Sequence, residues 1–295
     1  MTQQPGTSTL AAFAGAVLIG GANFVAVSIS NNELPPFFGA AIRFGIAAIL
    51  FFLLAWMRGV PLPRRRQAAG AALYGLLGFG VAYAGLYYAL VGLSAGTVSV
   101  IMAAVPLFTL AIAAALGQER LTVRGLLGGV LAVAGIAVLS LGTLGGDVRG
   151  AWLAAAIGGT IAASASSVVA RALREVHPLM MNALGMTAGT ILLTMGSMAV
   201  AEPWTLPRQP ATLAAVAWLV LLGSVGLFQL FLYVIRRWTA SATVYAITAM
   251  PVVAVALGIL LLGQPLTPTV AAGGALVMLA VYVGAISNAR QSGRG

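Results

Sequence analysis

The sequence predicts an all-α membrane protein: ten transmembrane helices in two inverted five-helix repeats around a central cavity. Three observations carry this prediction. Hydrophobic residues make up 61% of the chain and charged residues only 7%, with a mean hydropathy of +1.04, whereas a water-soluble chain of this length needs far more surface charge. The apolar residues gather into runs long enough to cross a bilayer. One long stretch of the chain also occurs twice at a constant offset.

Ten apolar runs are long enough to span a membrane, which takes about 20 residues of α-helix. Short connections rich in Arg, Pro and Gly separate them, as expected for helices joined by tight turns. The runs lack the period-2 alternation of a transmembrane β-barrel, the other structure that satisfies every backbone group in lipid. The predicted spans are residues 9–29, 35–57, 68–91, 94–116, 122–142, 150–170, 178–200, 211–235, 239–262 and 268–288.

The repeat begins at Gly78 and reappears 145 residues later without a gap. Matches of Ala and Leu carry little weight between two apolar segments, so the rarer residues decide. The matching residues are Gly78 and Gly223, Tyr88 and Tyr233, Pro106 and Pro251, Leu121-Thr122 and Leu266-Thr267, and Gly128-Gly129 and Gly273-Gly274. We therefore predict a first five-helix repeat over residues 1–145 and a second over residues 146–295.

The orientation of the predicted helices follows from arginine, which supplies all fifteen basic residues. With the N-terminus in the cytoplasm, inner segments hold twelve arginines and outer segments only Arg149 and Arg208. Both termini are then cytoplasmic, and a repeat of five spans makes the second copy run opposite to the first. The net charge of +10 thus reflects topology in a bacterial cytoplasmic membrane, with the lipid bilayer as partner and no nucleic acid.

Arg43 is the only charged residue well inside a predicted span. It lies about eight residues from the outer end of span 35–57, which is roughly 12 Å deep. A charge at that depth is costly and usually functional. Arg43 is expected to attract a carboxylate or another anionic group within a water-filled cavity, although a structural arginine bonded to helix-end carbonyls is the alternative.

Two prolines occupy equivalent places in spans 94–116 and 239–262. Pro106 and Pro251 each remove a backbone N–H and free the carbonyl four residues earlier, so both helices are predicted to kink. A lone proline is often only tolerated in a membrane helix. A symmetric pair is a stronger indication of a hinge or gate beside a transport site.

Polar residues inside the other spans complete a predicted substrate-binding set. Tyr83 and Tyr87 are four residues apart and share one helical face, where they could line a pocket for amphipathic or aromatic molecules. Asn23 and Gln229 are costly to bury in lipid and are expected to face water or a partner. The full predicted set is Asn23, Arg43, Tyr83, Tyr87, Ser99, Gln229 and Tyr245.

The sequence carries no catalytic or metal-binding pattern. All five acidic residues fall at span ends or in loops, and there is no cysteine. No phosphate-binding glycine loop followed by Lys, no metal-ligand cluster and no nucleophile–base pair is present. We therefore expect neither an enzyme nor a cofactor, but a secondary carrier for a small-molecule substrate, without buried acids to bind cations or relay protons.

The chain resembles the EamA-type transporters of the drug/metabolite transporter superfamily over essentially its whole length. The residues that carry the likeness are Ser94-Ala95, Pro106, Gly117-Gln118-Glu119-Arg120-Leu121-Thr122, Gly128-Gly129 and Gly135, with Ser241, Pro251, Gly263-Gln264-Pro265-Leu266-Thr267 and Gly273-Gly274 in the second copy. Gln264 departs from the acid that the family usually has there. The resemblance implies a central cavity between the repeats and export of metabolites, commonly amino acids. The tyrosine-rich third span makes the chain similar to the YddG-type aromatic amino-acid exporters.

The favoured function is therefore export of small amphipathic metabolites, amino acids and aromatic ones above all, by alternating access. A cationic-drug exporter of the same superfamily is an alternative, which the lack of a buried carboxylate disfavours. A membrane-embedded enzyme acting on lipids is a lesser alternative, because it would need a polar or metal-binding cluster. We expect a monomer and leave a homodimer open.

Overall fold

A computed structural model describes residues 7–117, 123–141, 147–237 and 240–283, with backbone alone at residues 139–141, 147–149, 231–232, 235–237 and 240–248. In these ranges every regular element is helical, and none is a strand. The first part of the chain holds α1 (Thr7–Ser30), α2 (Pro36–Met57), α3 (Arg65–Gly75), α4 (Ala82–Gly92), α5 (Ala95–Met102), α6 (Val105–Ala115) and α7 (Val123–Leu141). The second holds α8 (Asp147–Ala172), α9 (Pro178–Ala199), α10 (Pro210–Val220), α11 (Leu227–Arg237), α12 (Ala240–Leu262) and α13 (Pro268–Val281).

Seven helical segments of the described chain are long and apolar enough to cross a membrane. They are Thr7–Ser30, Pro36–Met57, Arg65–Gly92, Ala95–Ala115, Gly150–Ala172, Pro178–Ala199 and Pro210–Leu230. Three shorter apolar helices, Val123–Val138, Ala249–Leu262 and Pro268–Val281, fall within the remaining predicted spans. The described residues thus form a helical membrane protein, as the composition predicts.

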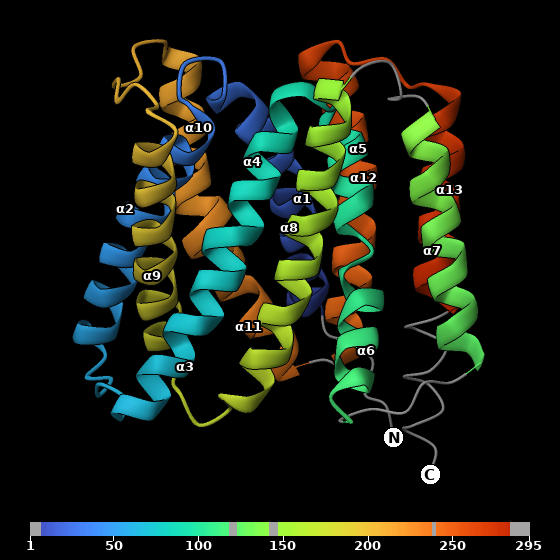
Figure 1. The fold of residues 1–295 in the computed structure, drawn as a ribbon. Coiled ribbons are helices and arrows are strands. Elements are labelled where there is room, and N and C mark those ends of the chain that lie inside the picture. The colour runs from blue at the N-terminus through green and yellow to red at the C-terminus, as the bar shows by residue number, and fades with distance from the viewer. Residues whose placement is uncertain (1–6, 118–122, 142–146, 238–239, 284–295) are drawn as a thin grey trace.

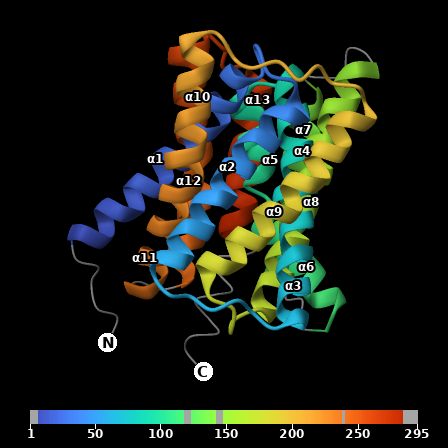
Figure 2. The same cartoon turned by 90° about the vertical axis from the view of Figure 1, so that its left-hand side faces the viewer.

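Helices from the two halves of the chain pack against each other in pairs. α2 lies along α9, α1 along α12 and α4 along α8 (Figures 1 and 2). Paired glycines bring α4 close to α8 and α3 close to α9: a side chain at Gly85 of α4 would overlap the Ala155 carbonyl of α8, and one at Gly75 of α3 would overlap the backbone of Gly185 in α9. Small residues are the usual means by which helices associate in lipid, where no hydrophobic effect drives them together.

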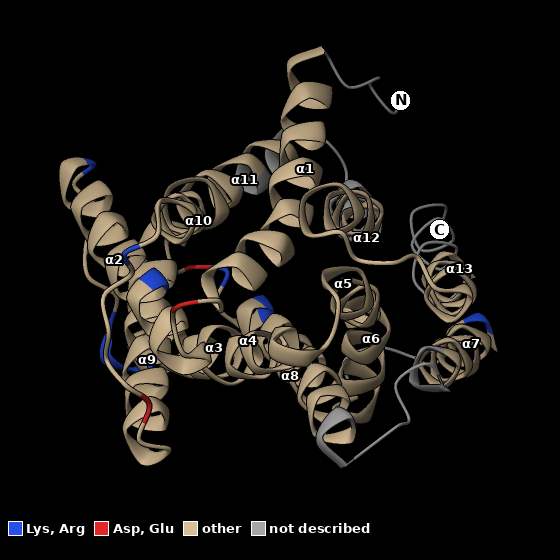
Figure 3. Ribbon diagram, turned by 90° about the horizontal axis from the view of Figure 1, so that it is seen from above, with Lys and Arg blue, Asp and Glu red and all other residues tan. Residues whose placement is uncertain are grey.

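The helices α7 and α13 form a separate pair at the edge of the bundle (Figure 3). They meet at Gly135, where an added side chain would lie 2.9 Å from the carbonyl oxygen of Gly273. The neighbouring Gly129 faces open space instead. This pair corresponds to the last span of each predicted repeat.

The third and eighth predicted spans are each interrupted by six residues of π-helix. Leu76–Val81 lies between α3 and α4, and Leu221–Gly226 lies between α10 and α11, 145 residues further on. We call these segments π1 and π2; they are drawn as continuous ribbon between the labelled helices in Figure 1. A π-helix bonds to the fifth residue instead of the fourth, which bulges the chain and leaves backbone groups available to other partners.

The two equivalent prolines have different effects on their helices. Helix α5 ends at Met102, a tight turn follows at Ala103 and Ala104, and α6 starts at Val105 with Pro106 in its first turn. A proline there sacrifices no hydrogen bond, because first-turn N–H groups lack intrahelical acceptors. Pro251 instead lies inside α12, which runs from Ala240 to Leu262. The first repeat therefore has a broken helix where the second has a continuous one.

Polar side chains hold the start of α5 and the break that ends it. Ser94 caps α5, since its Oγ accepts a hydrogen bond of 3.1 Å from the Thr97 N–H. The side-chain oxygen of Gln264 accepts one of 3.1 Å from the Ala95 N–H. On the other side of the break, the Ser164 hydroxyl of α8 lies 3.1 Å from the Val105 carbonyl. The residue equivalent to Gln264, Glu119, lies outside the described residues.

Candidate functional site

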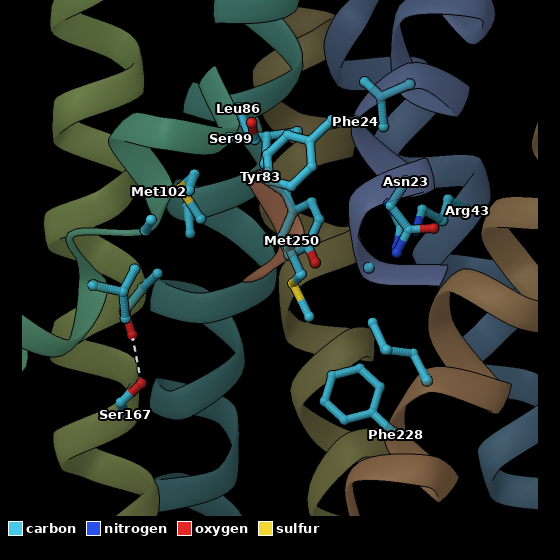
Figure 4. Close-up of a pocket in the computed structure, with 17 residues that line it drawn as sticks. Asn23, Phe24, Arg43, Tyr83, Leu86, Ser99, Met102, Ser167, Phe228 and Met250 are labelled. Atoms are coloured by element: carbon cyan, nitrogen blue, oxygen red, sulfur yellow. Dashed lines mark hydrogen bonds between the residues drawn. The ribbon is translucent and has the colours of Figure 1, made fainter. Parts of the chain in front are cut away.

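A cavity of about 290 Å³ lies between helices of both halves of the chain, among α1, α2, α4, α5, α8, α11 and α12 (Figure 4). Apolar and aromatic side chains form most of its wall. Its polar lining residues among those described are Asn23, Arg43, Tyr83, Ser99 and Ser167. A mainly apolar pocket with a few polar groups is the usual form of a small-molecule site.

Arg43 brings a full positive charge to this cavity from α2. Its side chain is 1% exposed. The guanidinium Nε donates a hydrogen bond of 3.1 Å to Ser224 Oγ, and Nη2 donates one of 3.1 Å to the Gly223 carbonyl. Nη1 is buried and makes no hydrogen bond to the described part of the chain. An unpaired buried donor on a charged group is costly, so Nη1 retains the capacity for one further hydrogen bond.

The segment π2 supplies both partners of Arg43. Gly223 and Ser224 lie within it, and the Ser224 hydroxyl donates to the Leu219 carbonyl at 2.9 Å, five residues back. This leaves the Ser224 oxygen free to accept from Arg43. The distorted backbone of the second repeat thus anchors the buried charge of the first.

Asn23 of α1 lies beside Arg43 (Figure 4) and is 9% exposed. Its Nδ2 donates to the Gly223 carbonyl at 3.2 Å, and its Oδ1 accepts from the Trp218 indole N–H at 3.2 Å. The indole can only donate, so it fixes which end of the amide carries the nitrogen. One N–H of Asn23 remains for a ligand. A side chain at position 223 would overlap the Asn23 amide, so this position requires glycine.

Aromatic rings pack around the guanidinium and form the adjoining wall of the cavity. The Cζ atom of Arg43 lies 4.9 Å from the ring centroid of Phe44 and 5.1 Å from that of Tyr83. Tyr83 in turn packs edge-on against Phe44, with centroids 4.6 Å apart. Phe79 connects this group to Phe228, which lines the far part of the cavity. Such cation–π contacts stabilise a buried guanidinium by about 1–2 kcal/mol without consuming its hydrogen-bond donors.

Ser99 reaches the cavity from α5. Its hydroxyl donates to the Gly96 carbonyl at 2.7 Å, so towards a ligand the oxygen acts as an acceptor. In Figure 4, Ser99 comes from a different side of the cavity than Arg43 and Asn23. The cavity therefore has a donor-rich end at Arg43 and a weakly polar, largely apolar remainder.

Three members of the predicted set lie elsewhere. Tyr87 is fully buried and does not line the cavity; its hydroxyl is near Arg43 but makes no hydrogen bond to the described chain. Gln229 is half-buried and does not line the cavity. Tyr245 lies on α12, but its side chain is outside the described residues. The structure thus brings Asn23, Arg43, Tyr83 and Ser99 together; the roles of all seven residues stay predictions.

Sequence reasoning did not single out Ser224 or Trp218 as site residues. Both lie in the eighth predicted span, far along the chain from Arg43 and Asn23, and their roles arise only from packing. One signal was available in part: Gly223 stood out as a repeated glycine. Its equivalence to Gly78 marked the place of π2, but not what its carbonyl binds.

At one end of the bundle, two glutamates connect the halves of the chain. Glu33, in the loop after α1, accepts hydrogen bonds from the Arg208 and Gln209 N–H groups just before α10, the shortest of them 2.9 Å. The Gln209 N–H is the main reason that the pKa of Glu33 lies below its ordinary value. Glu202, in the loop after α9, accepts at 3.1 and 2.8 Å from the Phe37 and Phe38 N–H groups in the first turn of α2. We call this pair of contacts the glutamate clasp.

Comparison with known proteins gives the family. The EamA-like transporter family matches the chain twice, over residues 7–141 and 150–285. The chain belongs to the EamA-like transporter family. The two matches also confirm that this EamA protein is built from two copies of one unit, as the offset of 145 residues predicts. The family is one of transporters, in line with the predicted carrier and not with an enzyme.

Relatives of this EamA transporter are named as membrane transporters and exporters. "Uncharacterized inner membrane transporter YedA" of Escherichia coli (strain K12) is 32% identical over 256 residues, covering 85% of this chain and 81% of that protein. "Probable terminal-alkyne amino-acid exporter" of Streptantibioticus cattleyicolor is 28% identical over 258 residues, covering 85% and 84%. "Probable amino-acid metabolite efflux pump" of Salmonella typhimurium is 25% identical over 292 residues, covering 90% and 91%.

The EamA fold also has a counterpart among solved structures. One crystal structure of a protein with 23% sequence identity superposes with a TM-score of 0.64, over 95% of this chain and 98% of that one. At this identity the likeness concerns the fold alone.

Proposed function

We propose that this EamA transporter exports small amphipathic metabolites that carry a carboxylate, amino acids among them and aromatic ones favoured. One observation carries the proposal: the buried Arg43 lines the cavity, and its Nη1 makes no hydrogen bond to the described chain. A carboxylate would supply the missing acceptor, in a charge-assisted bond that is roughly twice as strong as a neutral one. The uncommitted N–H of Asn23 would bind the second carboxylate oxygen.

The size and wall of the cavity support a small ligand with an apolar body. Its volume of about 290 Å³ is near the lower limit for small-molecule sites. Tyr83 and Phe228 both line it, and aromatic side chains favour edge-on or offset contacts with a ligand ring. The carboxylate would lie at Arg43, and the apolar body would extend along Tyr83 towards Phe228.

The mechanism we propose is alternating access between two inverted repeats, one on each side of residue 145. In this proposal the three shorter apolar helices complete a ten-span bundle, with both termini on the cytoplasmic side of a bacterial inner membrane. The cavity lies between the halves of the chain, as in transporters whose repeats rock around a central site. Pro106 and Pro251 would act as hinges; the break before Pro106 supports the first of these roles.

The names of two relatives support an amino-acid substrate, since one is called an amino-acid exporter and the other an amino-acid metabolite efflux pump. A cationic substrate fits less well, because the cavity already contains the unpaired charge of Arg43 and no acidic side chain lines it among the described residues. Like charges at close range are strongly unfavourable in a low-dielectric site.

Counterflow in proteoliposomes tests the proposed function. Vesicles loaded with unlabelled phenylalanine should take up labelled phenylalanine faster than protein-free vesicles do, and labelled threonine should exchange more slowly. Arg43→Ala in the same vesicles should abolish the exchange. The proposal fails if neither amino acid, nor any other carboxylate metabolite, exchanges above the protein-free control.

A further inference from the structure

We propose that the cavity prefers net-monoanionic carboxylates to zwitterionic amino acids, so that deaminated or N-acylated amino acids are its better substrates. This inference rests on the proposed function and narrows the substrate class of the same site. It comes from two features of the cavity: its net charge, and the way its hydrogen-bonding groups are already occupied.

The first feature is an uncompensated positive charge. Arg43 is the only charged residue among those that line the cavity, and the described glutamates Glu33, Glu175 and Glu202 lie in loops. The undescribed side chains of residues 240–248 include no Asp or Glu. A monoanion would neutralise this buried charge, whereas a zwitterion brings its own positive group and leaves a net charge of one in a low-dielectric site.

The second feature is that the polar end of the cavity offers charged and amide donors, while its free acceptors are neutral hydroxyls only. The Gly223 carbonyl already accepts from Arg43 and Asn23, and Ser224 Oγ accepts from Arg43. Asn23 Oδ1 is occupied by the Trp218 indole. What remains there in the described chain is Arg43 Nη1, one N–H of Asn23 and the hydroxyl of Tyr83. These groups suit a carboxylate, but an α-ammonium beside that carboxylate needs acceptors.

The hydroxyls of Tyr83 and Ser99 line the cavity and could accept a hydrogen bond from an ammonium. Both are neutral, so an ammonium one carbon away from the carboxylate would lose its hydration without gaining a counter-charge. The ammonium group weakens binding here, and replacing it by hydrogen, a keto group or an amide strengthens binding.

A monoanionic substrate also supplies a driving force for export. Cells keep a negative potential inside, so an anion that leaves alone moves with the field. A potential of 100 mV would sustain a concentration ratio of about 50-fold for one charge. Net export would then require neither a buried proton relay nor a coupling ion, and the lining of this cavity contains no acid for either purpose among the described residues.

Three compounds that share a phenylethyl group test the inference. Phenylalanine, 3-phenylpropanoate and 2-phenylethylamine carry net charges of zero, minus one and plus one at pH 7.5. Efflux of each is measured from proteoliposomes in which valinomycin and a potassium gradient set the potential, with the leak from protein-free vesicles subtracted. We expect 3-phenylpropanoate to leave at least about tenfold faster than phenylalanine, the effect of one badly paired charge. An inside-negative potential should accelerate it, and the amine should stay inside.

A charge change at Asn23 provides the second arm. Asn23→Asp places a carboxylate beside Arg43, so the preference should shift from 3-phenylpropanoate towards phenylalanine. Gly129→Ala, which adds a methyl group in open space on α7, should keep the wild-type preference. Phenylalanine efflux equal to or faster than that of 3-phenylpropanoate in the wild-type protein overturns the inference and leaves the proposed function standing. Efflux of none of the three compounds overturns both.

Discussion

Gly78 and Gly223 hold the same place in two π-helical segments, and each lies against a polar side chain of another helix. Gly78 meets Ser166 of α8, and Gly223 meets Asn23 of α1; any side chain at either glycine would overlap that neighbour. The outcomes differ between the halves. Ser166 donates to the Tyr74 carbonyl at 2.8 Å, whereas Asn23 donates to Gly223 itself. Only the second segment became the anchor of a buried charge.

Gly223→Ala should therefore impair substrate binding. The added methyl group would overlap the Asn23 amide. Relief of this overlap would shift the carbonyl of residue 223, which accepts from Arg43 Nη2. Crowding of this kind costs about 1–3 kcal/mol, which corresponds to a loss of roughly ten- to hundredfold in affinity for 3-phenylpropanoate or phenylalanine. Equilibrium binding to the detergent-purified protein measures it. Gly129→Ala is the matched control, and an equal loss in both variants would mean that the effect is one of membrane insertion.

Arg43→Ala should abolish transport while the protein still reaches the membrane. Arg43→Lys should also be impaired, because an ammonium cannot reproduce the planar fork that bonds Gly223 and Ser224 and still leaves a third nitrogen without a partner. Counterflow rates normalised to the amount of protein in the membrane report the effect. If membrane levels collapse in both variants, Arg43 serves the fold and not the substrate.

Ser224→Ala should weaken substrate binding, but less than Arg43→Ala does. It removes the acceptor of Arg43 Nε but leaves the Gly223 carbonyl in place. A hydrogen bond to a charged group contributes about 1.5–3 kcal/mol, so affinity should fall by about tenfold or more. Ser167→Ala serves as comparison, because the Ser167 hydroxyl lines the cavity but only bonds the Ala163 carbonyl of its own helix. Equal affinities in the two variants would contradict the role given to Ser224.

The two prolines should respond differently to replacement. Pro106→Ala lets α5 and α6 join into one helix, because the N–H at position 106 becomes available and the ring no longer clashes with the preceding turn. Pro251→Ala changes a helix that is already continuous. We expect turnover in counterflow to fall more in Pro106→Ala than in Pro251→Ala, with similar affinities. If turnover falls more in Pro251→Ala than in Pro106→Ala, the break before Pro106 is not the hinge of the first repeat.

The glutamate clasp should weaken in acid. The pKa of Glu33 is lowered from 4.5 in the folded protein, so the contact stabilises the fold fully above pH 4.5 and loses its effect as the pH falls through the lowered value. In detergent, the thermal unfolding midpoint of the wild-type protein should be higher than that of Glu33→Gln at neutral pH. The two midpoints should converge as the pH is lowered. Glu175→Gln, which changes an exposed acid with one bond of 3.4 Å from Gln67, should match wild type throughout. A constant gap between wild type and Glu33→Gln at every pH would contradict this assignment.

Much of the fold follows from the sequence because lipid imposes simple rules. Long apolar runs must become helices, and the repeated glycines at a fixed offset mark two related units, which the double family match confirms. The different fates of Pro106 and Pro251 could not be foreseen from their equal positions. Contacts from elsewhere, such as that of Ser164 with Val105, settle where a helix breaks. The π-helical segments are likewise a property of backbone bonding that composition does not reveal.

For the site, the sequence identifies the residue whose charge is costly to bury in the membrane, but not the residues that form hydrogen bonds to it. Arg43 stands out because no other charge lies deep in a span. Polarity alone also selects Tyr87 and Gln229, because it does not tell which face of a helix meets the cavity. The partners of Arg43 lie about 180 residues further along the chain. Only the packing of α2 against the second half makes Ser224 and Gly223 its neighbours.

The matching register of π1 and π2 has a consequence for the history of the chain. A π-helical bulge corresponds to one residue inserted into an α-helix, and two independent insertions would have no reason to fall 145 residues apart, each with glycine third in its segment. A single insertion before the two repeats separated accounts for both segments. Only π2 bonds Arg43, so the bulge is a feature of both repeats, whereas its use as an anchor for a buried charge is a feature of one.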